Sequence, residues 1–119
     1  YKTLISKFEG YLMIYDLIRK AEDEKDINMY MNLLHEEYSC TMHSSGKKFN
    51  KQEIKPFIEK IFSQNNLNYL NPRCIYENDE VLIRHQIMAF ENGTKEAVLV
   101  VEIKKDGKII KMETGATPL

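Results

Sequence analysis

The sequence predicts a single α+β domain over residues 1–119, with helices in its first half and an antiparallel sheet in its second. Four strand-like segments lie between Arg73 and Pro118, separated by short turns that contain Asn78-Asp79, Asn92-Gly93 and Asp106-Gly107. Both central residues of a type I′ hairpin turn need a positive φ angle, which Asn, Asp and Gly tolerate best. The first half instead repeats its apolar residues every three or four positions, as helices do. Helices followed by consecutive strands indicate the α+β class.

Composition narrows the classes of partner. The 119 residues carry 17 basic and 18 acidic side chains, and the formal charge is −1. Because the charges are interleaved and form no basic stripe, we expect no nucleic-acid partner. The longest apolar runs, residues 11–15 and 97–101, are too short to span a bilayer, so we expect no membrane partner. From this composition we expect a cytoplasmic location.

Two further expectations come from the cysteines and from the first residue. Cys40 and Cys74 are far apart in the sequence and form no C-x-x-C motif, so we expect reduced, buried thiols. The sequence begins with Tyr1 and not with Met, so we expect an upstream segment that has been removed or left out. Nothing in the sequence argues for a signal peptide.

The first helix is expected over residues 4–21. Its apolar side chains recur at helical spacing, and the charged run of residues 22–25 interrupts the pattern. Asp26 is a suitable N-cap for a second helix that we expect to reach about Glu36. Alternating apolar residues then predict a strand over residues 38–44, which Gly46 follows in a turn.

A third helix is expected after Asn50. Asn50 and Glu53 have the spacing of a capping box, in which each side chain bonds the backbone of the other residue. Residues 54–62 supply the apolar face. Pro56 lies inside this helix and lacks a backbone N–H, so we expect a distorted first turn or a kink.

Counting outward from two-residue turns predicts the register of the sheet. The face expected to pack on the helices contains Ile75, Leu82, Arg84, Gln86, Met88, Ala97, Leu99, Val101, Ile103, Ile110, Met112 and Thr114. The opposite face is expected to contain Ile83, His85, Ile87, Val98, Val100, Glu102, Lys111 and Glu113. Because that outer face mixes branched aliphatic side chains with charges, we expect it to self-associate. A single β-bulge would exchange the two faces beyond the point where it occurs.

The order and spacing of these elements resemble the nuclear transport factor 2-like superfamily, and within it the SnoaL-like and ketosteroid isomerase-like proteins of the cystatin-like α+β fold. The stretches that match are Lys25-Asp26, Leu33-Leu34-His35-Glu36-Glu37-Tyr38, Gly46, Glu53-Ile54, Val81-Leu82-Ile83-Arg84, Phe90-Glu91-Asn92-Gly93 and Lys105-Asp106-Gly107-Lys108-Ile109. The resemblance implies a curved sheet wrapped around a cone-shaped pocket that about three helices close. It also implies homodimers formed through the outer sheet face. The superfamily contains isomerases, cyclases, dehydratases, epoxide hydrolases, transport factors and binding domains, so the pocket must decide the function.

Polar residues on the helix-facing side are the candidates for ligand binding. Isomerases of the superfamily pair a carboxylate base with a Tyr or a protonated acid, and Tyr15 could supply such a hydroxyl or could be a core aromatic. Arg84 could hold a ligand carboxylate or enolate while Gln86 orients it, or it could form a structural ion pair with a carboxylate such as Asp16. The expected ligand-binding residues are Tyr15, Arg84, Gln86, Met88, Leu99 and Thr114.

The acid–base candidates are His85 and Glu113, together with Tyr15. His85 and Glu113 flank Val100 in the predicted register, so a His base oriented by a carboxylate is one interpretation. The same register places both on the outer face, where they would belong to a dimer interface. A bulge that exchanged the faces would make this pair the leading catalytic candidate.

Metal and nucleophile motifs are absent from the sequence. His35 and His43 have neither the H-x-H nor the H-E-x-x-H spacing, so we expect no metal site. The turn at Ser44-Ser45-Gly46 is not a G-x-S-x-G nucleophile motif, and we expect no cofactor.

Three functional hypotheses remain. The first is a domain that binds a small apolar molecule without a reaction. The second is an isomerase, cyclase or dehydratase that transfers a proton on a small carbonyl or polycyclic compound. The third is a protein-interaction module that uses the sheet face. A carboxylate or His near Tyr15 in the pocket would support the enzyme, whereas an Arg84 held by a fixed structural partner would count against it.

Overall fold

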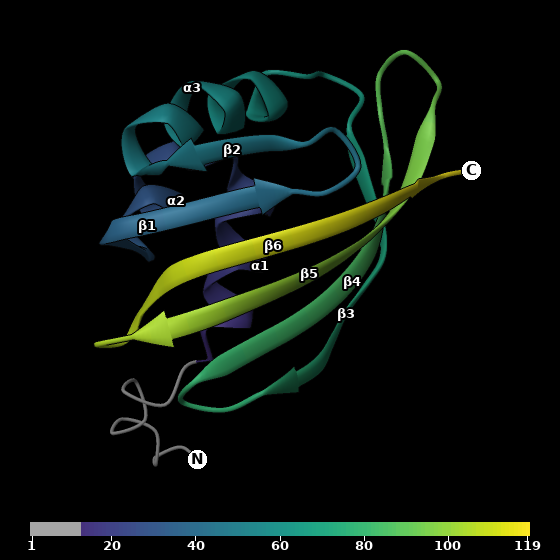
Figure 1. Ribbon diagram of the computed structural model, residues 1–119. Coiled ribbons are helices and arrows are strands. Elements are labelled where there is room, and N and C mark those ends of the chain that lie inside the picture. The colour runs from purple at the N-terminus through teal and green to yellow at the C-terminus, as the bar shows by residue number, and fades with distance from the viewer. Residues whose placement is uncertain (1–12) are drawn as a thin grey trace.

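The computed structural model describes residues 13–119, which form three helices on one face of a curved six-stranded sheet (Figure 1). The helices are α1 (Ile14–Glu24), α2 (Ile27–Asn32) and α3 (Lys51–Phe62). The strands are β1 (Leu34–Met42), β2 (Lys47–Asn50), β3 (Asn68–Glu77), β4 (Val81–Ala89), β5 (Lys95–Lys105) and β6 (Lys108–Pro118). Their order across the sheet is β2-β1-β6-β5-β4-β3. The predicted α+β class and curved sheet are confirmed.

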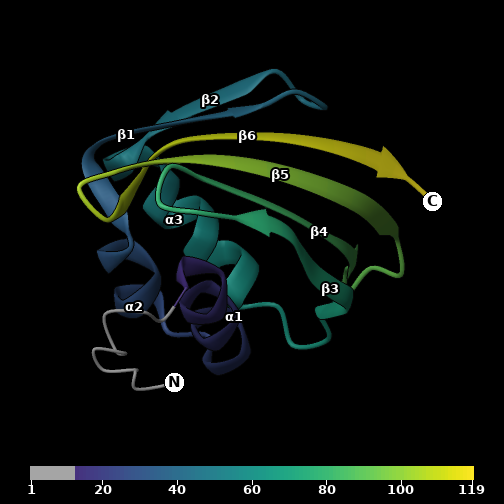
Figure 2. The same cartoon turned by 90° about the horizontal axis from the view of Figure 1, so that it is seen from below.

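The parallel pairing of β1 with β6 joins the two halves of the chain, and all other neighbouring strands are antiparallel. Figure 2 shows α1, α2 and α3 under the concave face of the sheet, while no described element covers the convex face. Below, the concave side is called the inner face and the convex side the outer face. The core lies between the inner face and the helices, where Ile18, Leu34, Ile54, Leu82 and Ile109 are fully buried.

The helix starts follow the sequence, and one helix is shorter than expected. Asp26 accepts a hydrogen bond from Met29 N at 3.0 Å, and Asn50 and Glu53 form the predicted capping box. The helix α3 continues through Pro56. However, α2 ends at Asn32, and β1 begins at Leu34 and not at residue 38. Leu34 is spaced as a helical residue, but its pairing with Ile109 of β6 decides in favour of the strand.

The N-terminus of α1 is capped by a carboxylate from the sheet. Met13 offers no side-chain cap, and Glu77 of β3 instead accepts hydrogen bonds from Ile14 N at 2.9 Å and Tyr15 N at 3.2 Å. Lys104 of β5 binds the same carboxylate at 2.6 Å. A negative charge at a helix N-terminus interacts favourably with the helix dipole. The part of the predicted first helix in residues 4–12 lies outside the described residues.

The loop between β4 and β5 is longer than the predicted two-residue turn. Ala89 pairs with Lys95, and the turn is closed by hydrogen bonds from Phe90 N to Thr94 O and from Gly93 N to Phe90 O, both 2.9 Å. Gly93 follows the turn with a φ of 91°, as in a three-to-five-residue hairpin with a glycine bulge. The register therefore moves by one residue, which moves every side chain of β5 to the opposite face.

The face assignment of β5 was consequently wrong. Val98, Val100 and Glu102 are buried under the helices, whereas Ala97, Leu99, Val101 and Ile103 lie on the outer face. A second irregularity compensates for the first in β6. The predicted turn at Asp106-Gly107 forms, but Ile103 pairs with Lys111 while Lys104 pairs with Ile109, so Ile110 is a bulged residue.

Beyond this bulge, the predicted inner placement of Met112 and Thr114 is correct, while Ile109 replaces Ile110 in the core. The predicted inner placement of Ile75 is also wrong. A register shift between Cys74 and Tyr76 leaves Ile75 half-exposed, and Leu82 pairs with Glu77 instead. Within residues 13–119, no helix is long and apolar enough to cross a membrane.

Candidate functional site

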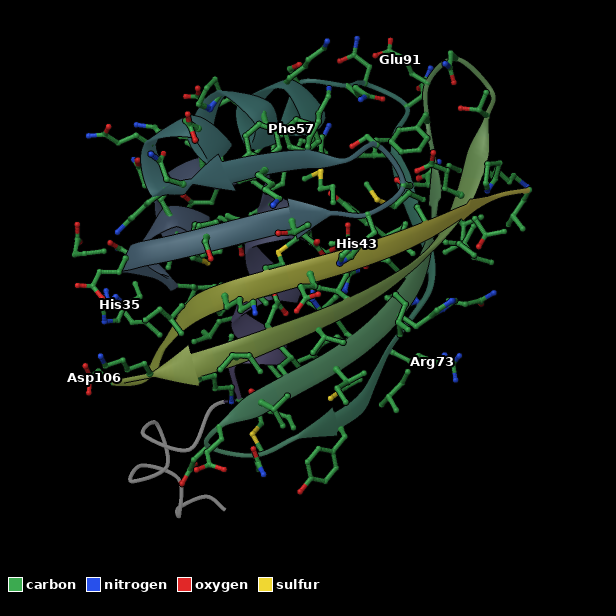
Figure 3. All side chains as sticks on the ribbon, in the orientation of Figure 1. His35, His43, Phe57, Arg73, Glu91 and Asp106 are labelled. Carbon is green, nitrogen blue, oxygen red and sulfur yellow. The ribbon has the colours of Figure 1, made fainter. Side chains whose placement is uncertain are left out.

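A cavity of about 330 Å³ lies between the inner sheet face and the helices. Its size falls at the low end of the range for small-molecule sites. The apolar part of the lining comes from α2, α3 and the strands and consists of Tyr30, Met42, Phe57, Ile58, Ile61, Phe62, Met88, Phe90, Val98, Val100, Met112 and Ala116. Figure 3 shows the position of Phe57 on α3, next to β2. The site is thus a largely apolar hollow between two layers of the fold that is partly open to solvent.

Polar side chains reach the cavity from two directions. Arg84, Gln86 and Thr114 project from β4 and β6 on the inner face, and Glu22 approaches from α1. The more exposed polar part of the lining consists of Ser44, Lys47, Lys60, Gln64, Tyr69 and Glu96. Among the predicted ligand-binding residues, the structure therefore brings Arg84, Gln86, Met88 and Thr114 together.

Arg84 is held by a fixed partner. Its Nε and Nη2 donate to the two carboxylate oxygens of Glu102 at 2.9 and 3.3 Å, and both side chains are almost completely buried. The predicted alternative partner was Asp16, but Glu102 fills this role because the shifted register moves it to the inner face. Burial by itself lowers the pKa of Arg84, yet the neighbouring carboxylates of Glu102 and Glu22 outweigh it and raise that pKa.

Glu22 extends the ion pair into a network between α1 and the sheet. Its Oε2 lies 3.6 Å from Arg84 Nη1, and its Oε1 accepts a hydrogen bond from Arg19 Nη1 at 2.6 Å. The buried Nη1 of Arg84 has no hydrogen-bond partner among the described residues. Arg19 Nη2 also binds Asp23 at 3.0 Å, so two guanidinium groups and three carboxylates form the network, with a formal charge of −1. Both oxygens of Glu22 face guanidinium groups.

Two predicted site residues do not line this cavity. Leu99 lies on the outer face with 44% of its side chain exposed, because the five-residue loop reverses β5. Its predicted place in the pocket was wrong. Tyr15 packs against the core at the start of α1 without reaching the cavity. Burial raises the pKa of its hydroxyl, but no His or carboxylate pairs with that hydroxyl among residues 13–119.

Tyr30 and Tyr69 are the phenols that do line the cavity. Burial raises the pKa of both hydroxyls well above the ordinary value for tyrosine, so both remain protonated. Tyr30 lies within the second helix expected from the sequence, but no motif indicated it as a site residue. Nothing in the sequence pattern indicated Tyr69 as a site residue. The strands were expected to begin at Arg73, whereas β3 begins at Asn68.

His85 and Glu113 lie on the outer face and are not partners. His85 pairs with Leu99, whereas Glu113 pairs with Val101 in a different row of the sheet. Glu113 Oε1 instead lies 2.9 Å from Nε2 of His43, which Figure 3 shows on the same face. The hydrogen bond with His43 and the charge of Lys111 lower the pKa of Glu113. The bulge in β6 therefore leaves this pair away from the cavity.

The described residues contain no group of three or more His, Cys, Asp or Glu side chains that could hold a metal ion. His35 accepts a hydrogen bond from Glu37 N and lies 3.8 Å from Asp106, at the opposite end of β1 from His43 (Figure 3). Cys40 is a buried thiol, as expected, but Cys74 is exposed at the sheet edge, so its predicted burial was wrong.

Comparison with solved structures identifies the fold. An NTF2-like protein of unknown function from Mesorhizobium loti is 14% identical, with 86% of this chain and 88% of that chain aligned and a TM-score of 0.73. A "putative ketosteroid isomerase" from Kribbella flavida is 12% identical over 87% of this chain and 76% of that chain, with a TM-score of 0.68.

An NTF2-like protein of unknown function from Burkholderia xenovorans has the same TM-score of 0.68 at 12% identity, over 82% of this chain and 75% of that chain. No protein-family model and no curated protein matches the sequence. At these identities the likeness establishes the fold, so the chain has the architecture of the nuclear transport factor 2-like proteins. The predicted resemblance is confirmed at that level, and the fold by itself does not specify an activity.

The buried pair of Arg84 and Glu102 predicts a specific pattern of stability. Because Glu102→Gln leaves the guanidinium without its charged partner, we expect the free energy of unfolding to fall by about 3–5 kcal/mol. The double variant Arg84→Met/Glu102→Leu removes both charges and should lose much less. Urea denaturation measures both, with Glu36→Gln at an exposed ion pair as the control. Equal losses in the single and double variants would contradict this account.

Proposed function

We propose that the chain is a small-molecule-binding domain that holds a largely apolar ligand in the cavity beneath the sheet and catalyses no reaction on it. The observation that carries this proposal is the state of Arg84. It is the strongest electrophilic group at the cavity, but Glu102 binds it through two hydrogen bonds and neutralises its charge. The inner part of the lining is mainly aliphatic and aromatic, which suits burial of an apolar molecule.

An enzyme that acts by proton transfer is the second candidate. Tyr30 and Glu22 favour it, because a protonated phenol and a carboxylate both line the cavity. The structural neighbour from Kribbella flavida is also described as a "putative ketosteroid isomerase". Against it, the two carboxylate oxygens of Glu22 face the guanidinium groups of Arg19 and Arg84, so neither oxygen is free to take a proton from a ligand. None of the three His side chains of the chain lines the cavity.

A pair of variants tests whether ligands occupy this cavity. Val98 lines it, and the adjacent Leu99 lies on the outer face. Val98→Phe fills part of the cavity, so it should weaken binding of a neutral apolar fluorescent dye such as N-phenyl-1-naphthylamine roughly tenfold. Leu99→Phe adds an aromatic ring to the other face and should leave the affinity unchanged. Equal effects of the two variants in a fluorescence titration would refute binding in the cavity.

Catalysis is tested by hydrogen exchange on a simple ketone. We expect the protein to leave the rate of deuterium incorporation next to the carbonyl of cyclohexanone, followed by NMR in heavy water, at the rate of buffer alone. Acceleration that disappears in Tyr30→Phe would establish the second candidate instead, because a phenol that stabilises an enolate is needed for that step.

We also propose that two copies of the chain associate through the outer sheet face. Tyr76, Leu99 and Ile103 are between 41% and 53% exposed on it. Lys111 and Glu113 lie two residues apart on the same strand, so a twofold axis across β6 can bring each lysine near the glutamate of the other copy. Both the apolar area and the mixed charges thus suit a self-complementary contact.

Sedimentation measures this association. The unmodified protein should sediment as a dimer, and Leu99→Glu should make it a monomer because it places a charge within the apolar part of the contact. Leu119→Glu changes an exposed leucine at the end of β6 and is the matched control. A monomeric unmodified protein would exclude the homodimer and favour the third hypothesis, in which the face recruits a different protein.

A further inference from the structure

We propose that the cavity takes an amphipathic carboxylate, with its apolar chain inside the cavity and its charged head at the mouth beside Lys47 and Lys60. This rests on the proposed function, because it names the class of ligand and its orientation for the same cavity. It differs from the expectation drawn from the sequence, in which Arg84 would hold a carboxylate within the fold.

The mouth of the cavity lies at one end of the sheet, between the β1–β2 turn, the end of α3 and the β4–β5 loop. Figure 1 and Figure 2 show the turn and the loop at this same end. The lining residues here are exposed or half-buried: Ser44, Lys47, Lys60, Gln64, Phe90 and Glu96. Farther inside, the lining is buried and includes Tyr30, Ile58, Val100 and Met112. A ligand that enters here therefore reaches an apolar interior past a polar rim.

The two lysines of the mouth carry charges that no described side chain neutralises. Within residues 13–119, the lysines that form ion pairs are Lys51, Lys104 and Lys111. Lys47 and Lys60 are exposed and form none. Glu96 of β5 is the carboxylate at this end of the lining, so the mouth has a formal charge of +1. An anionic head therefore meets a net positive charge here, and each ammonium group offers it three N–H donors.

The inner end of the cavity has the opposite sign. Glu22 and Arg84, which line it, are almost completely buried, and their network has a formal charge of −1. A carboxylate head at this end would face other carboxylates in a buried site, where an unpaired charge is costly. At the mouth, the same head keeps part of its water and is attracted by the lysines. This difference sets the orientation, with the chain inward and the head outward.

The mouth distinguishes three kinds of head group on one apolar chain. A carboxylate is attracted by Lys47 and Lys60, a neutral hydroxyl gains little from their charge, and an ammonium group is repelled. Because the lysines are exposed, water screens these interactions and each is modest. Burial of the chain against the aliphatic and aromatic lining supplies most of the affinity. The expected ligands are therefore fatty acids or ring-containing acids with one carboxylate and an otherwise hydrocarbon body.

Three probes with one alkyl chain test the head group: octanoate, octanol and octylamine. At about pH 7, octanoate is an anion and octylamine is a cation. Isothermal titration calorimetry at low salt should show that octanoate binds the unmodified protein roughly fivefold more tightly than octanol. Octylamine should bind more weakly than octanol. Added salt should reduce the advantage of octanoate, because it screens exposed charges.

Variants of the mouth locate the effect. Lys47→Gln and Lys60→Gln remove one charge and keep a polar side chain, so each should reduce the preference for octanoate while leaving octanol binding unchanged. Glu96→Gln removes the opposing charge and should increase that preference. Lys48→Gln on β2 and Lys55→Gln on α3 are matched controls, because both lysines are exposed on the same elements and neither lines the cavity.

The outcomes separate the head-group preference from the proposed function. Equal affinities for octanoate and octanol, both weakened by Val98→Phe, would overturn the preference and keep binding in the cavity. Tightest binding of octylamine would also overturn it. A preference for octanoate that survives in the double variant Lys47→Gln/Lys60→Gln would overturn the placement of the head at the mouth. If none of the three probes binds while the neutral dye still does, the inference is wrong and the proposed function stands. Failure of the dye to bind as well would overturn both.

Discussion

The buried ion pair between Arg84 and Glu102 is the interaction on which the arrangement of this molecule depends. It exists because β4 and β5 pair in one register, which sets Leu82 opposite Glu102 and leaves Glu102 diagonal to Arg84 on the inner face. Two charges without solvent contact tolerate little displacement, since each is destabilising without the other. If the pairing of β4 with β5 shifted by one residue, Glu102 would lie exposed on the outer face and Arg84 would be buried without its partner.

The same pair fixes how the helices sit on the sheet. Arg84 also attracts Glu22, which lies in the last turns of α1, and Glu77 of β3 caps the first turn of that helix. Both ends of α1 are therefore tied to the sheet by carboxylates, and Ile14, Ile18 and Ala21 of the helix are buried against the core between these ties. The cavity lies beside this contact, where side chains of α2 and α3 face the sheet.

Much of the fold could be predicted from local signals. Asp26, the pair Asn50 and Glu53, and the turn at Asp106-Gly107 act through nearby backbone atoms, and each forms the predicted feature. The beginning of β1 could not be predicted in this way, because Leu34 fits a helix as well as a strand. Only its contact with Ile109, far along the chain, decides between the two. Local patterns therefore locate most elements, and long-range pairing sets their limits.

The candidate site could be predicted only in part, for a physical reason in the turns. The dipeptide Asn92-Gly93 suits both a two-residue turn and a longer loop in which Gly93 follows the turn, and these differ by one residue in register. The chain adopts the longer loop, so Leu99 leaves the predicted pocket and Glu102 enters the core. The bulge at Ile110 then restores the expected placement of Met112 and Thr114. The sheet face of each β4 side chain was predicted correctly, because that prediction did not depend on the length of a turn.

The ligand-free cavity is a compromise between stability and binding. Gln86 and Thr114 line the cavity, while Arg84 Nη1 beside them is the buried polar atom that lacks a hydrogen-bond partner among the described residues, which costs free energy in the absence of a ligand. A sequence under selection for stability alone would place apolar side chains at these two positions, beside Val98 and Val100. Their polarity supports the proposal that the cavity binds a ligand. A ligand that binds the folded state alone returns stability in proportion to the logarithm of its concentration over its dissociation constant, so occupancy and stability of this domain rise together.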